Sequence, residues 1–257
     1  MNFQLLSLQG FVICAAYFFA GFIDAVCGGG GLITVPALMA IGIPAYFITG
    51  TNQASTVPGS FAAVYTYGKS GKYHLRSAAI TIPFALIGSF AGAKLNMLIP
   101  ERYLMFFMLA MVPLLAVFML VKKDVGAKSH IETLSPKRIA VVSACIGLTL
   151  GTYQGFYGPG GGTFFLLAYA LFLKLDLLKA NGNTRIVVSF SSIVSSITYA
   201  LAGRIVWPIA FAAMLLYMLG SYTGARFAIR RGSNGIRPLM FFVIVVLMGK
   251  VIYDLFF

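Results

Sequence analysis

The sequence turns on one stretch, Asp24-Ala25-Val26-Cys27-Gly28-Gly29-Gly30-Gly31 (DAVCGGGG), which is followed directly by the apolar run LITVPALMAIG. A carboxylate and four consecutive glycines interrupt what otherwise reads as one hydrophobic helix. Glycine permits a positive φ and a close approach by another group, so the run breaks the chain just before a new helix starts. The unpaired N–H groups and the positive dipole end of such a helix start attract anions. We therefore expect an anion site at this break.

The composition is that of a membrane protein. Of the 257 residues, 60% are hydrophobic and 10% are charged, and the mean hydropathy is +0.91. Seven apolar runs approach the roughly 20 residues that a helix needs to cross a bilayer; they are 47–67, 77–93, 103–121, 139–157, 186–202, 205–225 and 238–249. No strand-length alternation of polar and apolar residues is present, and backbone groups in lipid must be bonded internally. We predict an all-α integral membrane protein with about 8–10 helical segments.

The chain repeats itself. GFIDAVCGGGG at 21–31 aligns with GTYQGFYGPGG at 151–161, and after a slip of two residues GSFAGAK at 88–94 aligns with GSYTGAR at 220–226. This self-similarity predicts a first membrane repeat at 1–121, a cytoplasmic linker loop at 122–138 and a second membrane repeat at 139–257.

The basic residues indicate how the two copies are related. Loop 69–76 holds three Lys/Arg, whereas its counterpart near 203–206 holds one; 226–237 holds four, whereas its counterpart near 94–102 is weakly basic. Such a swap is typical of inverted-topology repeats, with chance among few charges as the alternative. Counting also 122–138 and 174–185, 15 of the 19 Lys/Arg lie in loops on one side. The positive-inside rule makes this side cytoplasmic and both termini non-cytoplasmic. This distribution also argues against a nucleic-acid partner.

Two segments after the glycine runs, 32–43 and 162–173, are too short to cross at about 1.5 Å per residue. We expect half-helices whose starts face one midplane site, because non-helical backbone at that depth must line a cavity or be buried. Close helix packing is the alternative role for these glycines, but four in a row, reproduced as GPGGG in the second copy, favour a site. The predicted binding glycines are Gly28, Gly29, Gly30, Gly31, Gly158, Gly160, Gly161 and Gly162.

The segments DAVCGGGGLITVPAL, TGTNQ and GFYGPGGGTF resemble the TauE/SafE family of membrane transporters, often called sulfite exporters. The resemblance covers essentially the whole chain and implies a bacterial inner-membrane protein that transports a small anion, commonly sulfite or an organosulfonate. The chain departs from perfect repeat symmetry at Gln154, opposite Asp24, and at Pro159, opposite Gly29. The two halves of a site therefore need not do equal jobs.

Asp24 is the only acid well inside an apolar segment, and an ionisable group there is a functional candidate by default. Burial disfavours the charged carboxylate, so Asp24 is our candidate for proton coupling. The alternative is that Asp24 caps the broken helix or accepts from a backbone N–H.

The polar triplet Thr51, Asn52 and Gln53 in TGTNQ aligns with Asn183, Thr184 and Arg185 in NGNTR. We expect both triplets at helix starts, after Gly50 and Gly182, where they cap the helix or bind a ligand together with Gln154. Arg185 is suited to bidentate binding of an oxyanion; the alternative is an anchor at the cytoplasmic helix end. The matching cations Lys94 and Arg226 are expected to extend towards lipid headgroups.

These features predict a secondary transporter that works by alternating access at a midplane site between inverted repeats. The alternative is an anion channel with a glycine-backbone filter. An enzyme is not expected, because both histidines, His74 and His130, lie in predicted loops and no nucleophile–base spacing is present. The cysteines lack metal-ligand spacing, so neither a metal nor a cofactor is predicted. The expected partners are a small anionic solute and the lipid bilayer.

Overall fold

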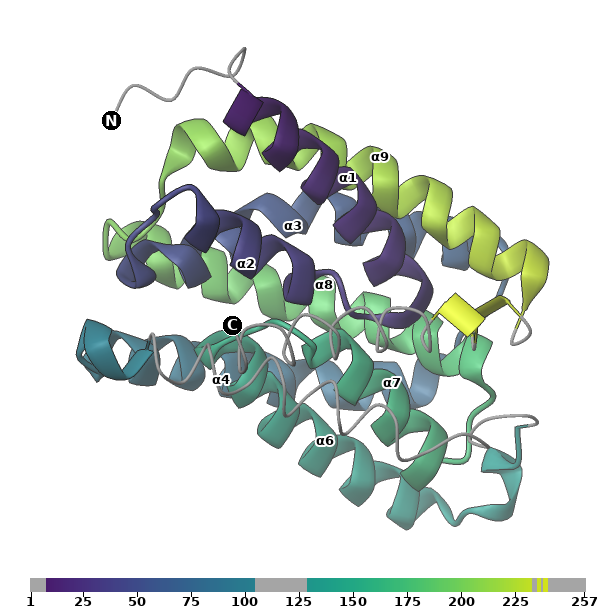
Figure 1. The fold of residues 1–257 in the computed structure, drawn as a ribbon. Coiled ribbons are helices and arrows are strands. Elements are labelled where there is room, and N and C mark those ends of the chain that lie inside the picture. The colour runs from purple at the N-terminus through teal and green to yellow at the C-terminus, as the bar shows by residue number, and fades with distance from the viewer. Residues whose placement is uncertain (1–7, 105–128, 233–234, 237, 240–257) are drawn as a thin grey trace, which may run out of the picture.

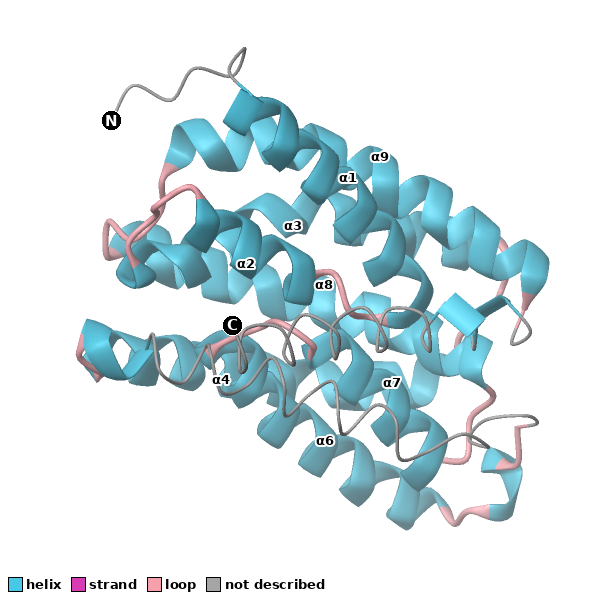
Figure 2. Cartoon of the chain, viewed as in Figure 1, coloured by secondary structure: helices cyan, strands magenta, loops and turns pink. Residues whose placement is uncertain are grey.

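The computed structural model describes residues 8–104, 129–232, 235–236 and 238–239. These residues form eight α-helices and one short 3-10 helix, and no strand occurs among them (Figure 1, Figure 2). The predicted all-α membrane fold is confirmed. Most of the apolar runs 103–121 and 238–249, and residues 122–128 of the predicted linker, lie outside the described residues.

Two sets of four helices follow one another in the same order of lengths. The first set is α1 (Leu8–Cys27), α2 (Gly31–Ala40), α3 (Ala45–Lys69) and α4 (Leu75–Leu98). After the 3-10 helix η1 (Ile131–Thr133), the second set is α6 (Pro136–Phe156), α7 (Gly161–Phe172), α8 (Leu177–Leu201) and α9 (Trp207–Arg231). The half-helices expected from the sequence are α2 and α7, with 10 and 12 residues.

Four described helices are long and apolar enough to cross a membrane, namely α4, α6, α8 and α9. Each has only part of its apolar surface buried inside the protein. The rest of that surface is available to lipid, as the large exposed side chains Ile87, Val141 and Leu215 illustrate.

The helix starts correct two predictions. α3 begins after Pro44, and α8 begins after Asp176, whose carboxylate accepts a hydrogen bond from the Lys179 N–H at 2.9 Å. Gly50 and Gly182 therefore lie inside helices, and the two polar triplets that follow them do not cap α3 or α8. The segment 174–185 is likewise mostly helix rather than loop, because the capping signal stands upstream at Asp176.

The two sets interlock. Figure 1 shows α1 and α9 along one side, α4 and α6 along the other, and α3 and α8 between them. α1 runs parallel to α9, since Tyr17 contacts Tyr217 and Phe22 contacts Phe227. In the other pair, α6 runs parallel to α4: Gly147 lies against Thr81, and Gly155 lies against Ser89. Each set thus supplies the first helix of one pair and the last helix of the other.

The central helices α3 and α8 run antiparallel. Gly50 near the start of α3 lies against Tyr199 near the end of α8, and the Tyr67 hydroxyl at the other end is 2.7 Å from Asn181 Nδ2. Together with the parallel packing of α3 on α9 and of α4 on α8, this arrangement makes each long helix of the first set run opposite to its counterpart.

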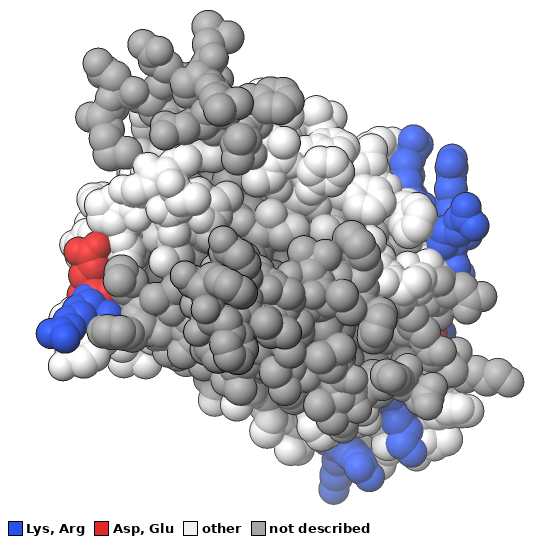
Figure 3. Space-filling model, in the orientation of Figure 1, with Lys and Arg blue, Asp and Glu red and all other residues white. Residues whose placement is uncertain are grey.

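The described basic side chains gather at one end of the bundle, where α3 and α9 stop and α4, α6 and α8 begin (Figure 3). They are Lys69, Lys72, Arg76, Lys137, Arg138, Lys174, Lys179, Arg226, Arg230 and Arg231. Lys94, Arg102 and Arg204 lie towards the opposite end. Arg185 belongs to neither end, because it is fully buried inside the bundle.

Gly155 offers a direct test of the α4–α6 packing. A Cβ at Gly155 would overlap the backbone carbonyl of Ser89, so Gly155→Ala should destabilise the protein by about 1–3 kcal/mol. Gly68→Ala is the matched control, because its Cβ would lie 3.7 Å from the nearest atom, in the Tyr73 ring. Thermal unfolding in detergent should give a lower Tm for Gly155→Ala alone; equal Tm values would contradict this packing.

Candidate functional site

The two glycine segments meet. Gly28 and Gly158 occupy matching positions, with φ values of +87° and +92°, and each directs the chain into a short helix. The Thr163 N–H donates to the Gly28 carbonyl at 3.2 Å, and Thr163 Oγ1 donates to the Cys27 carbonyl at 3.0 Å. A Cβ at Gly28 would overlap the backbone of Gly162, so only glycine permits this contact between the two sets of helices.

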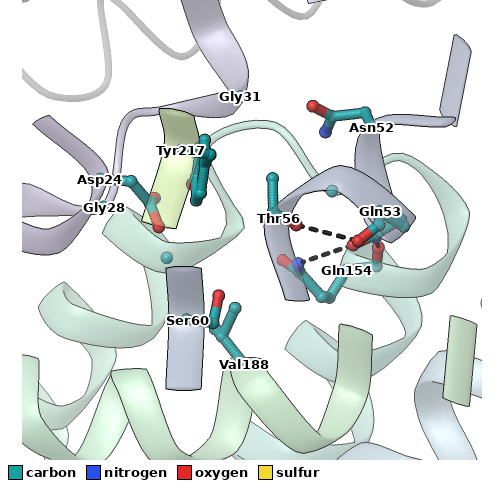
Figure 4. Close-up of a pocket in the computed structure, with 13 residues that line it drawn as sticks. Asp24, Gly28, Gly31, Asn52, Gln53, Thr56, Ser60, Gln154, Val188 and Tyr217 are labelled. Atoms are coloured by element: carbon teal, nitrogen blue, oxygen red, sulfur yellow. Dashed lines mark hydrogen bonds between the residues drawn. The ribbon is translucent and has the colours of Figure 1, made fainter. Parts of the chain in front are cut away.

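A cavity of about 20 Å³ lies between the two helix starts (Figure 4). This volume has room for about one water molecule, so an oxyanion needs a wider form of the cavity. Polar side chains and glycine backbone make up most of its lining, which consists of Asp24, Gly28, Gly31, Asn52, Gln53, Thr56, Ser60, Gln154, Gly158, Gly160, Gly162, Val188 and Tyr217. The cavity lies deep inside the bundle, because Thr56 and Val188 stand near the midpoints of α3 and α8.

Asp24, on one side of the cavity, forms a buried ion pair with Arg185, which lies behind the lining and joins the two sets of helices. Arg185 Nη1 of α8 donates to Asp24 Oδ2 of α1. The other carboxylate oxygen, Asp24 Oδ1, lies 3.4 Å from the Gly30 N–H. Asp24 is 8% exposed and Arg185 is 0% exposed. The alternative assignment of Arg185 as a cytoplasmic-end anchor is therefore wrong.

The remaining donors of Arg185 are unsatisfied. Nε and Nη2 are both buried, and neither has a hydrogen-bond partner within the described part of the chain. Nη2 lies close to the start of α7, since a carbon added at Gly162 would be 2.8 Å from it. A buried donor without a partner is costly, and more so on a charged group. The free N–H groups of a guanidinium match the spacing of oxyanion oxygens.

The opposite side of the cavity carries a neutral counterpart of this pair. Gln53 Nε2 of α3 donates to the Gln154 backbone carbonyl of α6. Gln53 Oε1 lies 3.5 Å from Gln154 Nε2 (Figure 4). It also accepts a hydrogen bond from Ser192 Oγ at 3.1 Å. Gln154 aligns with Asp24, and Gln53 aligns with Arg185. The same two positions therefore pair across the halves twice, once with charges and once with amides.

Several predicted site residues lie outside the lining. Thr51 Oγ1 accepts from the Val206 N–H at 3.0 Å, and Asn183 Oδ1 accepts from the His74 N–H at 2.8 Å. These N–H groups belong to the residues that precede α9 and α4, so the two side chains tie the halves together at the loops. Thr184 Oγ1 donates within its own helix, to the Ala180 carbonyl at 2.9 Å. Gly29, Gly30, Gly161 and Arg185 also lie outside the lining, and Arg185 contacts it through Asp24 and the Gly162 position.

Four lining residues were not predicted. Thr56 and Ser60 follow Asn52 at intervals of four residues on α3, so they share its helical face, and this spacing could have identified them. Val188 and Tyr217 carry no comparable signal, because their position depends on how α8 and α9 pack. Within the described residues, no group of His, Cys, Asp and Glu side chains is placed to hold a metal ion.

Comparisons with known proteins find relatives whose names describe membrane transporters. Residues 13–251 match the family model described as "Sulfite exporter TauE/SafE". The chain is 30% identical over 253 residues to a "Probable membrane transporter protein" of Haemophilus influenzae, covering 97% of this chain and 96% of that protein. It is 30% identical over 250 residues to "Probable membrane transporter protein ORF9" of Sinorhizobium sp., with 96% and 93% covered. No solved structure matches significantly.

A third relative is "Probable membrane transporter protein YfcA" of Escherichia coli K12. It is 28% identical over 235 residues, which cover 91% of this chain and 86% of that protein. Each of the three matches spans at least 91% of this chain.

The buried ion pair predicts strong coupling between its partners. Asp24→Asn or Arg185→Gln alone removes one charge of a buried pair, and each should destabilise the protein by about 3–5 kcal/mol. The double variant resembles the amide pair on the other side of the cavity and should recover most of that loss. Thermal unfolding of the four proteins in detergent measures the coupling. Additive losses in the double variant would rule out the pair as the source of the effect.

Proposed function

Because the chain belongs to the sulfite exporter TauE/SafE family of membrane transporters, we propose that it is a secondary transporter of a small anion, with sulfite or an organosulfonate as the substrate. The observation that carries this proposal is the buried Arg185, whose Nε and Nη2 are unsatisfied beside the glycine segments. An oxyanion reaching this point would satisfy both groups at once.

The helix starts add to this attraction. Gly31 at the start of α2 and Gly160 and Gly162 at the start of α7 line the same cavity. Each start brings the positive end of a helix dipole, which favours a negative charge. The amides of Asn52, Gln53 and Gln154 supply N–H donors without adding charge. The recognition is therefore of an anion with several acceptor oxygens.

The proposed mechanism is alternating access. Matched helices of the two sets run in opposite directions, as inverted-topology repeats do, and the cavity lies where the two sets meet. A volume of about 20 Å³ excludes an oxyanion, so loading requires one set to move relative to the other. On this basis the glycine segments are the hinge as well as the site.

Asp24 is the proposed proton carrier. Without substrate, its carboxylate neutralises Arg185; with an oxyanion on Arg185, a second negative charge would be buried nearby. Protonation of Asp24 removes that charge, so one ion pair replaces another and the buried charge stays balanced. A monovalent anion would then move together with one proton.

We place the protein in a bacterial inner membrane with its basic end towards the cytoplasm. The described basic side chains at the ends of α3 and α9 and the starts of α4, α6 and α8 support this orientation. With this orientation the N-terminal end of α1 faces the other side, since α1 runs parallel to α9.

A channel is the second candidate, and the glycine backbone at the cavity favours it as a filter. The two candidates differ in rate. Purified protein in planar bilayers would carry single-channel anion currents if it were a channel, whereas a carrier gives substrate counterflow in liposomes and no unitary currents.

Ligand-induced stabilisation tests the role of Arg185. Sulfite should raise the Tm of the wild-type protein by mass action and should raise that of Asp24→Asn by more, because the variant leaves Arg185 without its internal partner. Arg185→Gln should not respond. The matched control is Arg204→Gln, which removes another buried arginine, one that donates to the Met97 carbonyl outside the cavity. A sulfite response retained by Arg185→Gln would refute this site.

Proton coupling has its own test. In proteoliposomes, Asp24→Asn should retain sulfite exchange at equilibrium but should lose accumulation driven by a pH gradient. Wild-type protein in the same liposomes provides the reference for both activities. If accumulation by Asp24→Asn still followed the pH gradient, Asp24 would not be the coupling residue.

A further inference from the structure

A groove of about 320 Å³ opens at the basic end of the bundle, between the last turns of α3 and α9. Three of its lining residues are cations, and none is acidic. The lining consists of Tyr65, Thr66, Lys69, Ser70, Tyr222, Arg226, Ile229 and Arg230. The groove lies outside the cavity described above, since the two share no lining residue.

Aromatic rings position two of these cations. Lys69 Nζ lies 4.7 Å from the centre of the Tyr65 ring, and Arg226 Cζ lies 4.6 Å from the centre of the Tyr222 ring. Both positive charges line the same groove. The ion pairs of the described residues join Lys179 to Asp176 and Arg185 to Asp24, so neither neutralises this groove. Among the residues that the structure describes, no acidic side chain therefore pairs with this cluster.

The repeat provides an internal comparison. α3 starts at Ala45, and its counterpart α8 starts 132 residues later at Leu177. Most of the positions that match the groove by this offset line a second groove, the counterpart groove, of about 300 Å³, between α8 and α4. The two grooves have similar volumes, but the second is lined by one cation instead of three. The counterpart is lined by Phe90, Lys94, Val194, Ile197, Thr198, Leu201 and Ala202.

The differences between the grooves are specific. Leu201 stands at the position that matches Lys69, and Leu98 stands at the position that matches Arg230. Lys94, which matches Arg226, remains as the single cation and lies 5.7 Å from the centre of the Phe90 ring. Packing of the helix ends thus accounts for a groove at both places. It does not account for the three cations, because the second groove packs with only one.

We propose that the groove lined by Lys69, Arg226 and Arg230 binds the phosphate of an anionic phospholipid of the membrane leaflet at the basic end. Exposed apolar side chains continue from it along the same two helices towards the middle of the bundle: Phe61 and Tyr65 on α3, and Leu215 and Leu219 on α9. They give acyl chains a surface below the headgroup, which free phosphate does not need. Basic pockets between membrane helices are suited to anionic headgroups.

Native mass spectrometry of the detergent-purified full chain tests the proposal. After titration with phosphatidylglycerol or phosphatidylcholine, the wild-type protein should retain phosphatidylglycerol preferentially. The variant Lys69→Leu/Arg230→Leu copies the counterpart groove and should weaken retention by about fivefold for each cation removed. Lys94→Gln, in the counterpart groove, is the matched control and should retain phosphatidylglycerol as the wild type does.

Four results would overturn the proposal, and three of them concern lipid retention. These are equal retention of the two lipids, undiminished retention by the double variant, or an equal loss in Lys94→Gln. A fourth is a rise in Tm of the delipidated protein with inorganic phosphate but not with short-chain phosphatidylglycerol, which would assign the groove to free phosphate. Because Lys69 and Arg230 are exposed, the variants should stay folded. Arg230→Leu alone, with an expected loss of about fivefold, repeats the test with a smaller change.

Discussion

The structure depends on a contact of backbone with backbone. Gly28 lies against Gly162 and Thr163, and the absence of side chains there lets the break in one set of helices touch the break in the other. That closeness brings α1 within reach of α8, so Arg185 can pair with Asp24 from the opposite half. A side chain at Gly28 or Gly162 would push the two glycine segments apart. The buried Arg185 guanidinium would then lose its carboxylate partner, which is strongly destabilising.

The two halves share a backbone plan and divide the charge unequally. In the centre, Asp24 and Arg185 are ionised groups, whereas Gln154 and Gln53 fill the matching positions with amides. At the helix ends, three cations line one groove, whereas one cation lines its counterpart. A symmetric scaffold needs only matching shapes, so charge that appears on one side alone points to something the symmetric packing does not require. In both places the charge in question is positive, so the proposed ligand is an anion.

The sequence was sufficient for the fold class. Hydropathy and the recurrence of the glycine motif predicted an all-helical membrane fold, and the short apolar segments predicted α2 and α7. It was less informative about where helices begin: Gly50 and Gly182 resembled starts, but Asp176 and Pro44, several residues upstream, determine them. Alignment of the copies showed Gln154 opposite Asp24 and Gln53 opposite Arg185. It could not show that these residues pair with each other, because the pairing follows from the crossing of the halves. The same holds for Tyr217, which reaches the cavity only because α9 packs on α1 and α3.

The exchange of helices between the halves also bears on how the chain assembles. α6 follows its partner α4 in the chain, whereas α1 emerges first and its partner α9 emerges last among the described helices. Until α8 and α9 have been synthesised, the α1 face at Gly21 lacks its packing partner on α9, and Asp24 lacks Arg185 of α8. An unpaired carboxylate makes it energetically costly for that helix to lie in lipid. The first helix therefore gains its ion-pair partner only once α8 has been made and its main packing partner only once α9 has been made.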